Sequence, residues 1–182
     1  MKKITALLAL LLIVLSVAKA QKEIFNPVYT GVTSLSIAPD SRAGAMGDVG
    51  CATDPYFDNN NQYWNPAKYP FTGSPAGLSL CYTPWLRQLV SDIDLAYLTG
   101  YYKIDRYSAV SSSLTYFSLG EVLADSYTIR PYEMALDFAY SRMLSQSLSA
   151  AVGLRVIYSD LQYDYSDDVT AGNSFAADIA LY

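Results

Sequence analysis

The sequence predicts an all-β protein, a transmembrane antiparallel β-barrel with a plug in its lumen. Residues 132–142 and 147–158 alternate apolar residues with small or polar ones over about ten positions, which is typical of strands that cross a membrane. After an amino-terminal export signal, no apolar run approaches the roughly 20 residues that a spanning helix needs. In lipid, every backbone polar group must be satisfied internally, so a membrane protein of this kind must span by strands closed into a barrel.

Residues 1–20 have the pattern of a secretory signal peptide. Lys2 and Lys3 precede an apolar run over 4–17, and Ala18-Lys19-Ala20 offers a small-x-small cleavage site. We expect cleavage after Ala20 and a mature chain that starts at Gln21. The predicted location is the outer membrane of a Gram-negative bacterium.

The composition narrows the function classes. Loss of the three signal-peptide lysines leaves nine basic groups against 17 acidic ones, a net charge of -8, so nucleic acid is not expected as a partner. The 17 tyrosines suit a barrel with aromatic rings at both membrane interfaces, although a soluble all-β protein can also be rich in tyrosine. The chain has no histidine. A Ser-His-Asp triad, a His-liganded zinc and a His proton shuttle are therefore excluded within these residues. We predict no catalytic residue, no cofactor-binding residue and no metal ligand.

The chain is expected to open with irregular structure. Residues 21–37 are predicted to form an amino-terminal arm with a first short strand over 32–37. Alternation is lost over 38–75, where glycine, proline, asparagine and aspartate accumulate. An irregular stretch of this length is unusual in a compact domain unless it has a function. Since a barrel offers a lumen to fill, residues 38–75 are predicted to be the plug, or hatch.

Two short motifs lie in this plug. Gly44, Gly47 and Gly50 repeat at every third position as in some phosphate loops, but no strand leads in and no Lys-Ser/Thr follows, so we predict a flexible turn. Asn65 and Pro66 have the chemistry of a helix start, which predicts one helical turn over 66–69. An ordinary Asn-Pro turn is the alternative.

Cys51 and Cys81 are the two cysteines of the chain. An oxidising periplasm would allow them to form a disulfide. Two small packed thiols are an equal alternative, and the sequence leaves this open.

Residues 76–182 are predicted to form barrel strands. The first strand ends at Pro84, because proline cannot donate to a ladder. Further strands are expected from 93 onward, over 107–117 with a weak face assignment, over the two segments named first, and from 175 onward, while 120–130 is predicted to be a loop. The tight connection over 142–146 is predicted to face the periplasm, and the long one over 159–173 the exterior. The apolar positions that alternate with small or polar ones in these strands are Leu78, Leu80, Tyr82, Ile93, Leu95, Tyr97, Phe175, Ala177, Ile179 and Leu181.

In the segment 132–142, Tyr132 and Tyr140 bracket the apolar face. Eight residues at roughly 3.4 Å each put these rings about 27 Å apart along the strand, close to the spacing of two aromatic girdles. The other face carries Glu133 and Asp137, with Arg155 on the next strand. Two carboxylates could in principle perform acid-base chemistry. We predict instead that these three are solvated or paired charges facing the lumen.

The segments amount to six or seven strands, whereas closed bacterial barrels have at least eight. We therefore expect an incomplete barrel that belongs to a longer protein. A barrel shared among several chains is the alternative.

Residues 44–67 resemble the hatch of the FadL-like outer-membrane proteins. Five further runs resemble the PorV family in particular, and they lie at 38–42, 65–71, 82–86, 116–121 and 139–142. PorV, also called LptO, is the FadL-like outer-membrane component of the type IX secretion system of Bacteroidetes. The resemblance covers essentially the whole mature chain, except that the family has more Gly and Thr in the loop 120–130. It implies that the chain is the amino-terminal part of a 14-stranded barrel. The plug-motif residues that match are Gly44, Gly47, Gly50, Asp54, Trp64, Asn65, Pro66 and Ala67.

The resemblance implies a shuttle and not an enzyme. The expected partners are outer-membrane lipid, the type IX translocon and attachment-complex proteins, and the carboxy-terminal signal domains of secreted cargo, which the protein carries from translocon to attachment complex. A FadL-type transporter of hydrophobic small molecules is the alternative, and lipopolysaccharide O-deacylation a third hypothesis. The inner faces read from the sequence consist of Ser, Ala, Gly, Asp and Glu, which do not suit a fatty acid.

Overall fold

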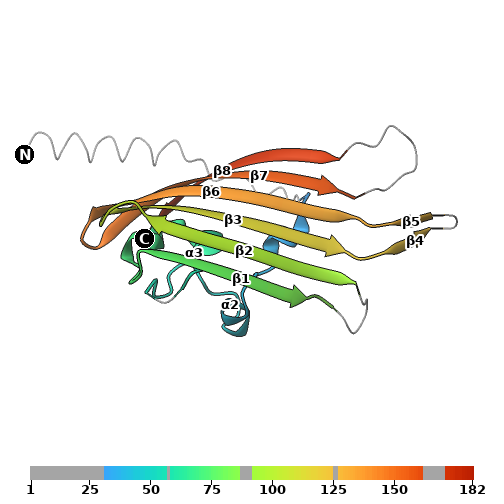
Figure 1. Ribbon diagram of the computed structural model, residues 1–182, viewed down its shortest axis with the longest axis horizontal. Helices are drawn as coiled ribbons and strands as arrows, with labels where there is room; N and C mark the ends of the chain where they lie inside the picture. Colours follow the sequence, from blue (N-terminus) through green and yellow to red (C-terminus); the bar gives the residue numbers. More distant parts are fainter. Residues whose placement is uncertain (1–30, 57, 87–91, 125–126, 162–170) are drawn as a thin grey trace, which may run out of the picture. The chain divides into compact units, whose positions relative to one another are not determined.

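An open antiparallel sheet of six strands dominates the fold, in the order β1-β2-β3-β6-β7-β8, beside a separate two-stranded sheet, β4-β5 (Figure 1). This computed structural model describes residues 31–56, 58–86, 92–124, 127–161 and 171–182, so the predicted signal peptide and most of the arm lie outside the described residues. The sheet is not closed, and β1 and β8 are its two edges. The strands are β1 (Ala76–Pro84), β2 (Ile93–Lys103), β3 (Ser108–Leu119), β4 (Val122–Ala124), β5 (Tyr127–Ile129), β6 (Tyr132–Ser145), β7 (Leu148–Asp160) and β8 (Gly172–Leu181).

One face of the sheet carries a continuous apolar surface, which we call the apolar belt. Residues that are direct cross-strand partners share a face, so the register identifies its rows. The central row crosses all six strands, and each of its side chains is exposed: Leu80, Leu98, Leu114, Leu136, Val156 and Phe175. The alternation predicted for 132–142 and 147–158 is thus confirmed in β6 and β7.

Tyrosines flank the apolar belt at both ends. Tyr132 lies between Tyr116 and Tyr158, with ring centroids 5.9 and 5.8 Å away. At the opposite end of the strands, Tyr102 and Tyr140 are exposed on the same face. The belt is therefore bounded by aromatic rings in the way that the sequence predicted for β6.

The other face, which we call the inner face, is lined mainly by small and polar residues on β3, β6 and β7, but by large apolar and aromatic residues on β2. There the prediction was wrong. Leu95 and Tyr97, each 1 % exposed, lie on the inner face together with Tyr101 and, from β3, Phe117. These side chains avoid water because helical elements cover them. Tyr97 packs edge-on against Tyr63, and Tyr101 stacks on Tyr69.

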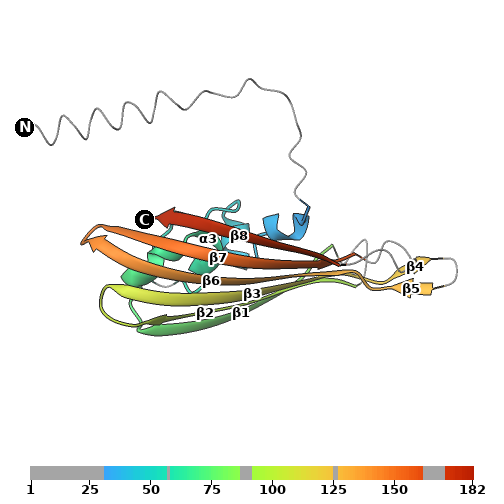
Figure 2. The same cartoon turned by 90° about the horizontal axis from the view of Figure 1, so that it is seen from above.

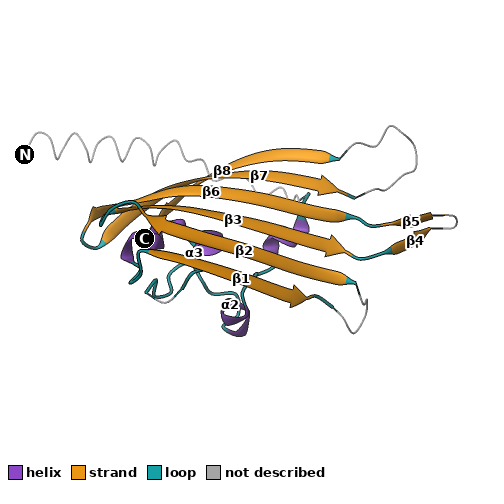
Figure 3. Cartoon of the chain, in the orientation of Figure 1, coloured by secondary structure: helices purple, strands orange, loops and turns teal. Residues whose placement is uncertain are grey.

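Residues 32–56 and 58–75, which we call the covering segment, contact this inner face through the helical elements over 61–64 and 66–71 (Figures 2 and 3). The segment contains η1 (Thr33–Ser36), α2 (Ser41–Ala45), α3 (Asn61–Trp64) and η2 (Pro66–Phe71), joined by turns. The last of these contacts five strands of the sheet, β2, β3, β6, β7 and β8. Within the described ranges, no helix has the length and apolar character needed to cross a membrane.

Two predicted elements were wrong. The strand expected over 32–37 is the short 3-10 helix η1, because Ile37 donates its N–H to the carbonyl of Ser34 within the segment, and among the described residues no strand pairs with it. The loop expected over 120–130 contains the hairpin β4-β5. The hairpin contains Val, Leu, Tyr, Thr and Ile, which have high strand propensity, and its two strands form three cross-strand pairs. The end of β1 at Pro84 is confirmed.

The connections differ in length at the two ends of the sheet. Residues 104–107 join β2 to β3 and residues 146–147 join β6 to β7, so both connections at this end are short. The other end has the connections 85–92, 120–131, which contains the hairpin, and 161–171. The short connection predicted over 142–146 is present, but it contains only 146–147 because β6 continues to Ser145. The predicted long loop lies mostly outside the described residues. Which end faces the periplasm stays a prediction.

Candidate functional site

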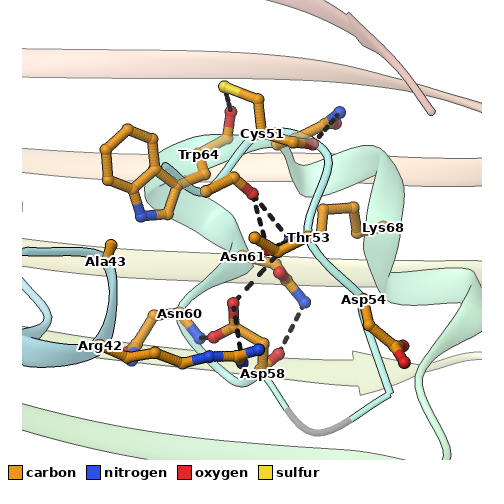
Figure 4. A network of polar contacts seen from close by, with 12 residues as sticks. Arg42, Ala43, Cys51, Thr53, Asp54, Asp58, Asn60, Asn61, Trp64 and Lys68 are labelled. Atoms are coloured by element: carbon orange, nitrogen blue, oxygen red, sulfur yellow. Dashed lines mark hydrogen bonds and ion pairs between the residues drawn. The ribbon is translucent and has the colours of Figure 1, made fainter. Parts of the chain in front are cut away.

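A buried lysine holds the irregular part of the covering segment together (Figure 4). Lys68 is fully buried, and its Nζ donates to the carbonyl of Gly50 at 2.9 Å and to Oγ1 of Thr53 at 2.8 Å. Asp58 supplies the countercharge at 3.8 Å, and Arg42 lies 4.0 Å from the same carboxylate. Burial lowers the pKa of the Lys68 ammonium, while the Asp58 carboxylate acts in the opposite direction. Three oxygen atoms thus take the place of water around the buried amino group.

Trp64 packs closely against the backbone of the same turn. Its Nε1 donates to Oδ2 of Asp40 at 3.1 Å, while Oδ1 of Asp40 caps α2 by accepting from Ala43. A Cβ at Gly50 would come within 2.2 Å of the indole ring. Only glycine fits there, which gives Gly50 a packing reason that its spacing in the sequence did not reveal.

Asn65 begins η2 as predicted. Its side-chain oxygen accepts from the N–H of Ala67 at 3.0 Å, and Pro66 occupies the first turn. The helical turn is therefore confirmed, and it continues to Phe71. The side-chain amide of Asn65 also donates to the carbonyl of Leu181 on β8, a contact that could not be predicted from the sequence.

Further contacts fasten the covering segment to the inner face. Ser149 of β7 donates to the carbonyl of Ala67, and Ser111 of β3 donates to Oε1 of Gln62. Together with the contact of Asn65, these bonds tie the segment to three separate strands.

The three charged residues predicted for the lumen all lie on the inner face, within the strands that the covering segment contacts. Arg155 donates through Nε to Oδ1 of Asp137, whose other oxygen accepts from Ser113 at 3.1 Å. Glu133 instead accepts from Ser34 of η1 and from Ser159. The two carboxylates are therefore engaged with separate partners.

A buried tyrosine pair links η2 to β2. The rings of Tyr69 and Tyr101 stack with centroids 4.6 Å apart. The hydroxyl of Tyr69 donates to the carbonyl of Asn59 at 3.0 Å and accepts from the N–H of Gln62 at 2.9 Å. Burial raises the pKa of the Tyr69 phenol well above its ordinary value of 10.0.

Other predicted plug residues do not join this network. Gly44 lies in α2 with open space around it, and Gly47 adopts a left-handed φ of 76° just after that helix. Asp54 accepts from the N–H of Tyr56 in a local turn, and its side chain points away from Lys68 in Figure 4. The three glycines therefore have three different environments and do not form one loop.

The cysteines are both free thiols. Cys51 is exposed, and its sulfur lies 3.6 Å from the carbonyl of Trp64. Cys81 is partly exposed on β1, with its sulfur 3.8 Å from the side-chain oxygen of Asn60. The two cysteines therefore form no disulfide in this structure, and the alternative of two small packed thiols does not fit the exposed Cys51.

Sequence reasoning missed Lys68, Asp58, Asp40 and Ser149. A lysine is almost never fully buried unless it is paired, and its partners here come from positions up to 18 residues away. The one signal available was its place directly after Asn65-Pro66-Ala67, inside the predicted helical turn.

These contacts are suited to holding a segment in place. Across the residues that the structure describes, no group of His, Cys, Asp and Glu could bind a metal ion. A cavity of about 280 Å³ lies between α3 and the strands β6, β7 and β8, and it is lined by both polar and apolar residues. The charged members of its lining are Asp137, Arg155 and Asp178.

Comparison with known proteins gives the family. No curated protein matches the chain. The family described as type IX secretion system protein PorV matches residues 18–182, which is nearly the whole sequence. The chain therefore belongs to the PorV family and is a component of the type IX secretion system.

Proposed function

We propose that this chain forms the wall and plug of a FadL-like outer-membrane β-barrel, as the amino-terminal part of a 14-stranded barrel, and that the barrel shuttles secreted cargo. It would bind the carboxy-terminal signal domain of the cargo at the translocon and deliver it to the attachment complex at the cell surface. PorV proteins are outer-membrane components of the type IX secretion system. The observation that carries the proposal is the two-faced sheet, with the apolar belt on one side and the covering segment on the other.

The apolar belt supports a wall in contact with lipid. Its central row presents six large apolar side chains to the outside, one from each strand, and tyrosines bound it at both ends. A soluble protein rarely exposes a contiguous apolar surface of this extent. Contact with the hydrocarbon of a membrane would remove this surface from water, and it would need no additional protein to do so.

The covering segment supports a plug. Its polar contacts reach β3, β6, β7 and β8 through Gln62, Ser34, Ala67 and Asn65. Contacts spread over four strands keep the segment on the inner face. A barrel filled in this way would block free diffusion while its mouth and loops remain available for cargo.

The end of the sheet with the long connections is the better candidate for gripping a folded domain. The two connections at the opposite end contain only four and two residues, which leaves little surface there. At the long-connection end, the hairpin β4-β5 extends beyond the six-stranded sheet (Figure 1), and Leu123 in it is 83 % exposed. Strand edges of this kind can pair with an edge of a β-sandwich.

A photo-cross-linking experiment tests the location of the grip. A cross-linker replaces Leu123 at the long-connection end or, as the matched control, Tyr107, which is 56 % exposed at the short-connection end. We expect cargo signal-domain adducts from position 123 only, in living cells whose cargo release is blocked. Adducts from neither position, or from 107 alone, would contradict the proposal.

Deletion of the gene separates the shuttle from the other hypotheses. The shuttle predicts that cargo accumulates in the periplasm while uptake of fatty acids is unchanged. Loss of uptake with normal secretion would instead support the small-molecule transporter. Altered lipid acylation alone would support the deacylation hypothesis.

A further inference from the structure

We propose that a groove in the apolar belt binds one acyl chain of a phospholipid of the periplasmic leaflet, with the lipid phosphate close to Arg142. This inference rests on the proposed function, because that function places the belt in the membrane. It adds a specific lipid site, which the two-faced sheet does not by itself require.

The groove lies where two small residues face each other across strands. Gly100 of β2 and Ser112 of β3 are direct cross-strand partners, and both point to the outside. The hollow has a volume of about 560 Å³, within the usual range of small-molecule sites of about 300–1,000 Å³. The outward side chains that border it are Leu78, Leu98, Tyr102, Val110 and Phe138.

The position of the groove identifies its occupant as hydrocarbon. Along β2, Gly100 is two residues from Leu98 in the central row of the belt and two residues from Tyr102 in the flanking tyrosines. The groove therefore opens at the depth where the proposed barrel meets acyl chains. The outward side chains at its rim are aliphatic and aromatic, and Ser112 adds a small hydroxyl on the same outward face.

A positive charge lies at the distance that a phospholipid requires. Arg142 is exposed and shares the outward face of β6 with Phe138, four residues away, or about 14 Å along the strand. This separation accommodates a glycerophosphate at the arginine and an acyl chain that runs toward the groove. Beside it, the connection 104–107 contributes one exposed arginine, Arg106, and one carboxylate, Asp105, so the local charge stays positive.

The end of the barrel at which Arg142 lies determines which membrane leaflet would supply the lipid. Arg142 and the groove lie toward the short connections, which are predicted to face the periplasm. The leaflet on that side offers phospholipids. Arginine is suited to this position, since its stem can lie along apolar surface while the guanidinium contacts a phosphate.

Filling the groove tests the proposal. Ser112→Leu replaces the hydroxyl by an isopropyl group in the hollow, whereas Ala177→Leu adds an isopropyl group on the outward face of β8, away from the groove. The full-length proteins are extracted from their own outer membrane in mild detergent, and retained lipids are counted by native mass spectrometry. We expect one retained phospholipid in the wild type and in Ala177→Leu, and an occupancy about tenfold lower in Ser112→Leu. Equal retention in all three, or no retained lipid in the wild type, would overturn the proposal.

A second measurement applies even if Ser112→Leu does not assemble. A photo-cross-linker in place of Leu98, at the rim of the groove, should give an adduct with the mass of a phospholipid. A protein adduct or a lipopolysaccharide adduct would contradict the proposed occupant. Cargo export is measured in the same cells. If the wild type exports cargo but retains no lipid, the lipid site is wrong and the shuttle is unaffected. If the deletion strain does not trap cargo in the periplasm, the shuttle itself is wrong.

Discussion

Arg155 of β7 and Asp137 of β6 are direct cross-strand partners, and Nε of Arg155 donates to Oδ1 of Asp137 on the face that the covering segment contacts. The carboxylate is more deeply buried than the guanidinium, with side-chain exposures of 8 % and 22 %. Ser113 satisfies the second carboxylate oxygen. The pair thus connects three neighbouring strands, β3, β6 and β7.

Asp137→Asn should destabilise the folded protein by about 1–3 kcal/mol, because it leaves the guanidinium of Arg155 without its charged partner. Unfolding by denaturant in lipid vesicles measures the change. Arg155→Gln and the double variant complete a double-mutant cycle. A coupling energy near zero would show that the pair contributes nothing beyond its separate members.

Gly50→Ala should disturb the covering segment, because the added Cβ would overlap the indole of Trp64 at 2.2 Å. We expect a loss of about 1–3 kcal/mol and a shift in tryptophan fluorescence as the ring leaves its hydrogen bond with Asp40. Gly44→Ala is the matched control. It lies in α2 with open space around it and should be neutral or stabilising by about 0.4–1 kcal/mol.

Lys68→Met should loosen the turn over 50–58 without changing the sheet. The substitution removes the hydrogen bonds to Gly50 and Thr53. It leaves the Asp58 carboxylate with the longer ion pair to Arg42 and the hydrogen bond from the N–H of Asn60. Faster amide exchange in this turn, with unchanged protection in β6, is the expected result. Arg42→Gln removes a partly exposed ion pair and should change exchange much less. Equal effects of the two substitutions would show that Lys68 does not stabilise this turn more than the exposed ion pair does.

Tyr69 should make the covering segment sensitive to alkali. Its phenol has a raised pKa in the folded protein, so its contribution to stability is complete below the ordinary value of 10.0 and declines as the pH rises above it. The difference in stability between the wild type and Tyr69→Phe, followed from pH 8 to pH 11, isolates this group from the other tyrosines. We expect the variant to be less stable at pH 8, where it lacks two hydrogen bonds, and the gap to narrow above pH 10. A gap that is independent of pH would contradict the burial of the phenol.

Leu114→Lys tests whether the apolar belt meets lipid. A lysine at the middle of a membrane-facing strand costs about 2–4 kcal/mol, whereas one near or beyond the interface costs about 0–1 kcal/mol. Leu123→Lys, in the hairpin β4-β5, provides the comparison outside the belt. We expect impaired assembly in the membrane only for the first variant, measured by heat-modifiable migration on gels. Normal assembly of both would indicate that the belt does not face lipid.

The sequence by itself determined the strands of the six-stranded sheet, because alternation with a period of two depends only on which neighbours point to the same side, but it did not determine the hairpin β4-β5. It gave β6, β7, the end of β1 at Pro84 and the start of η2 at Asn65. It also gave the charged character of positions 133, 137 and 155. All of these follow from interactions between residues close together in the chain.

The tertiary structure decided the rest. Leu95 and Tyr97 belong to the inner face, and Lys68 is buried, because the covering segment packs there through bonds between residues far apart in the sequence. Ser149 and Ala67 are 82 positions apart, and Asn65 and Leu181 are 116 apart. Local periodicity carries no information about which distant surface covers a strand, so the face of β2 and the partners of the buried lysine could be seen only once the chain had folded.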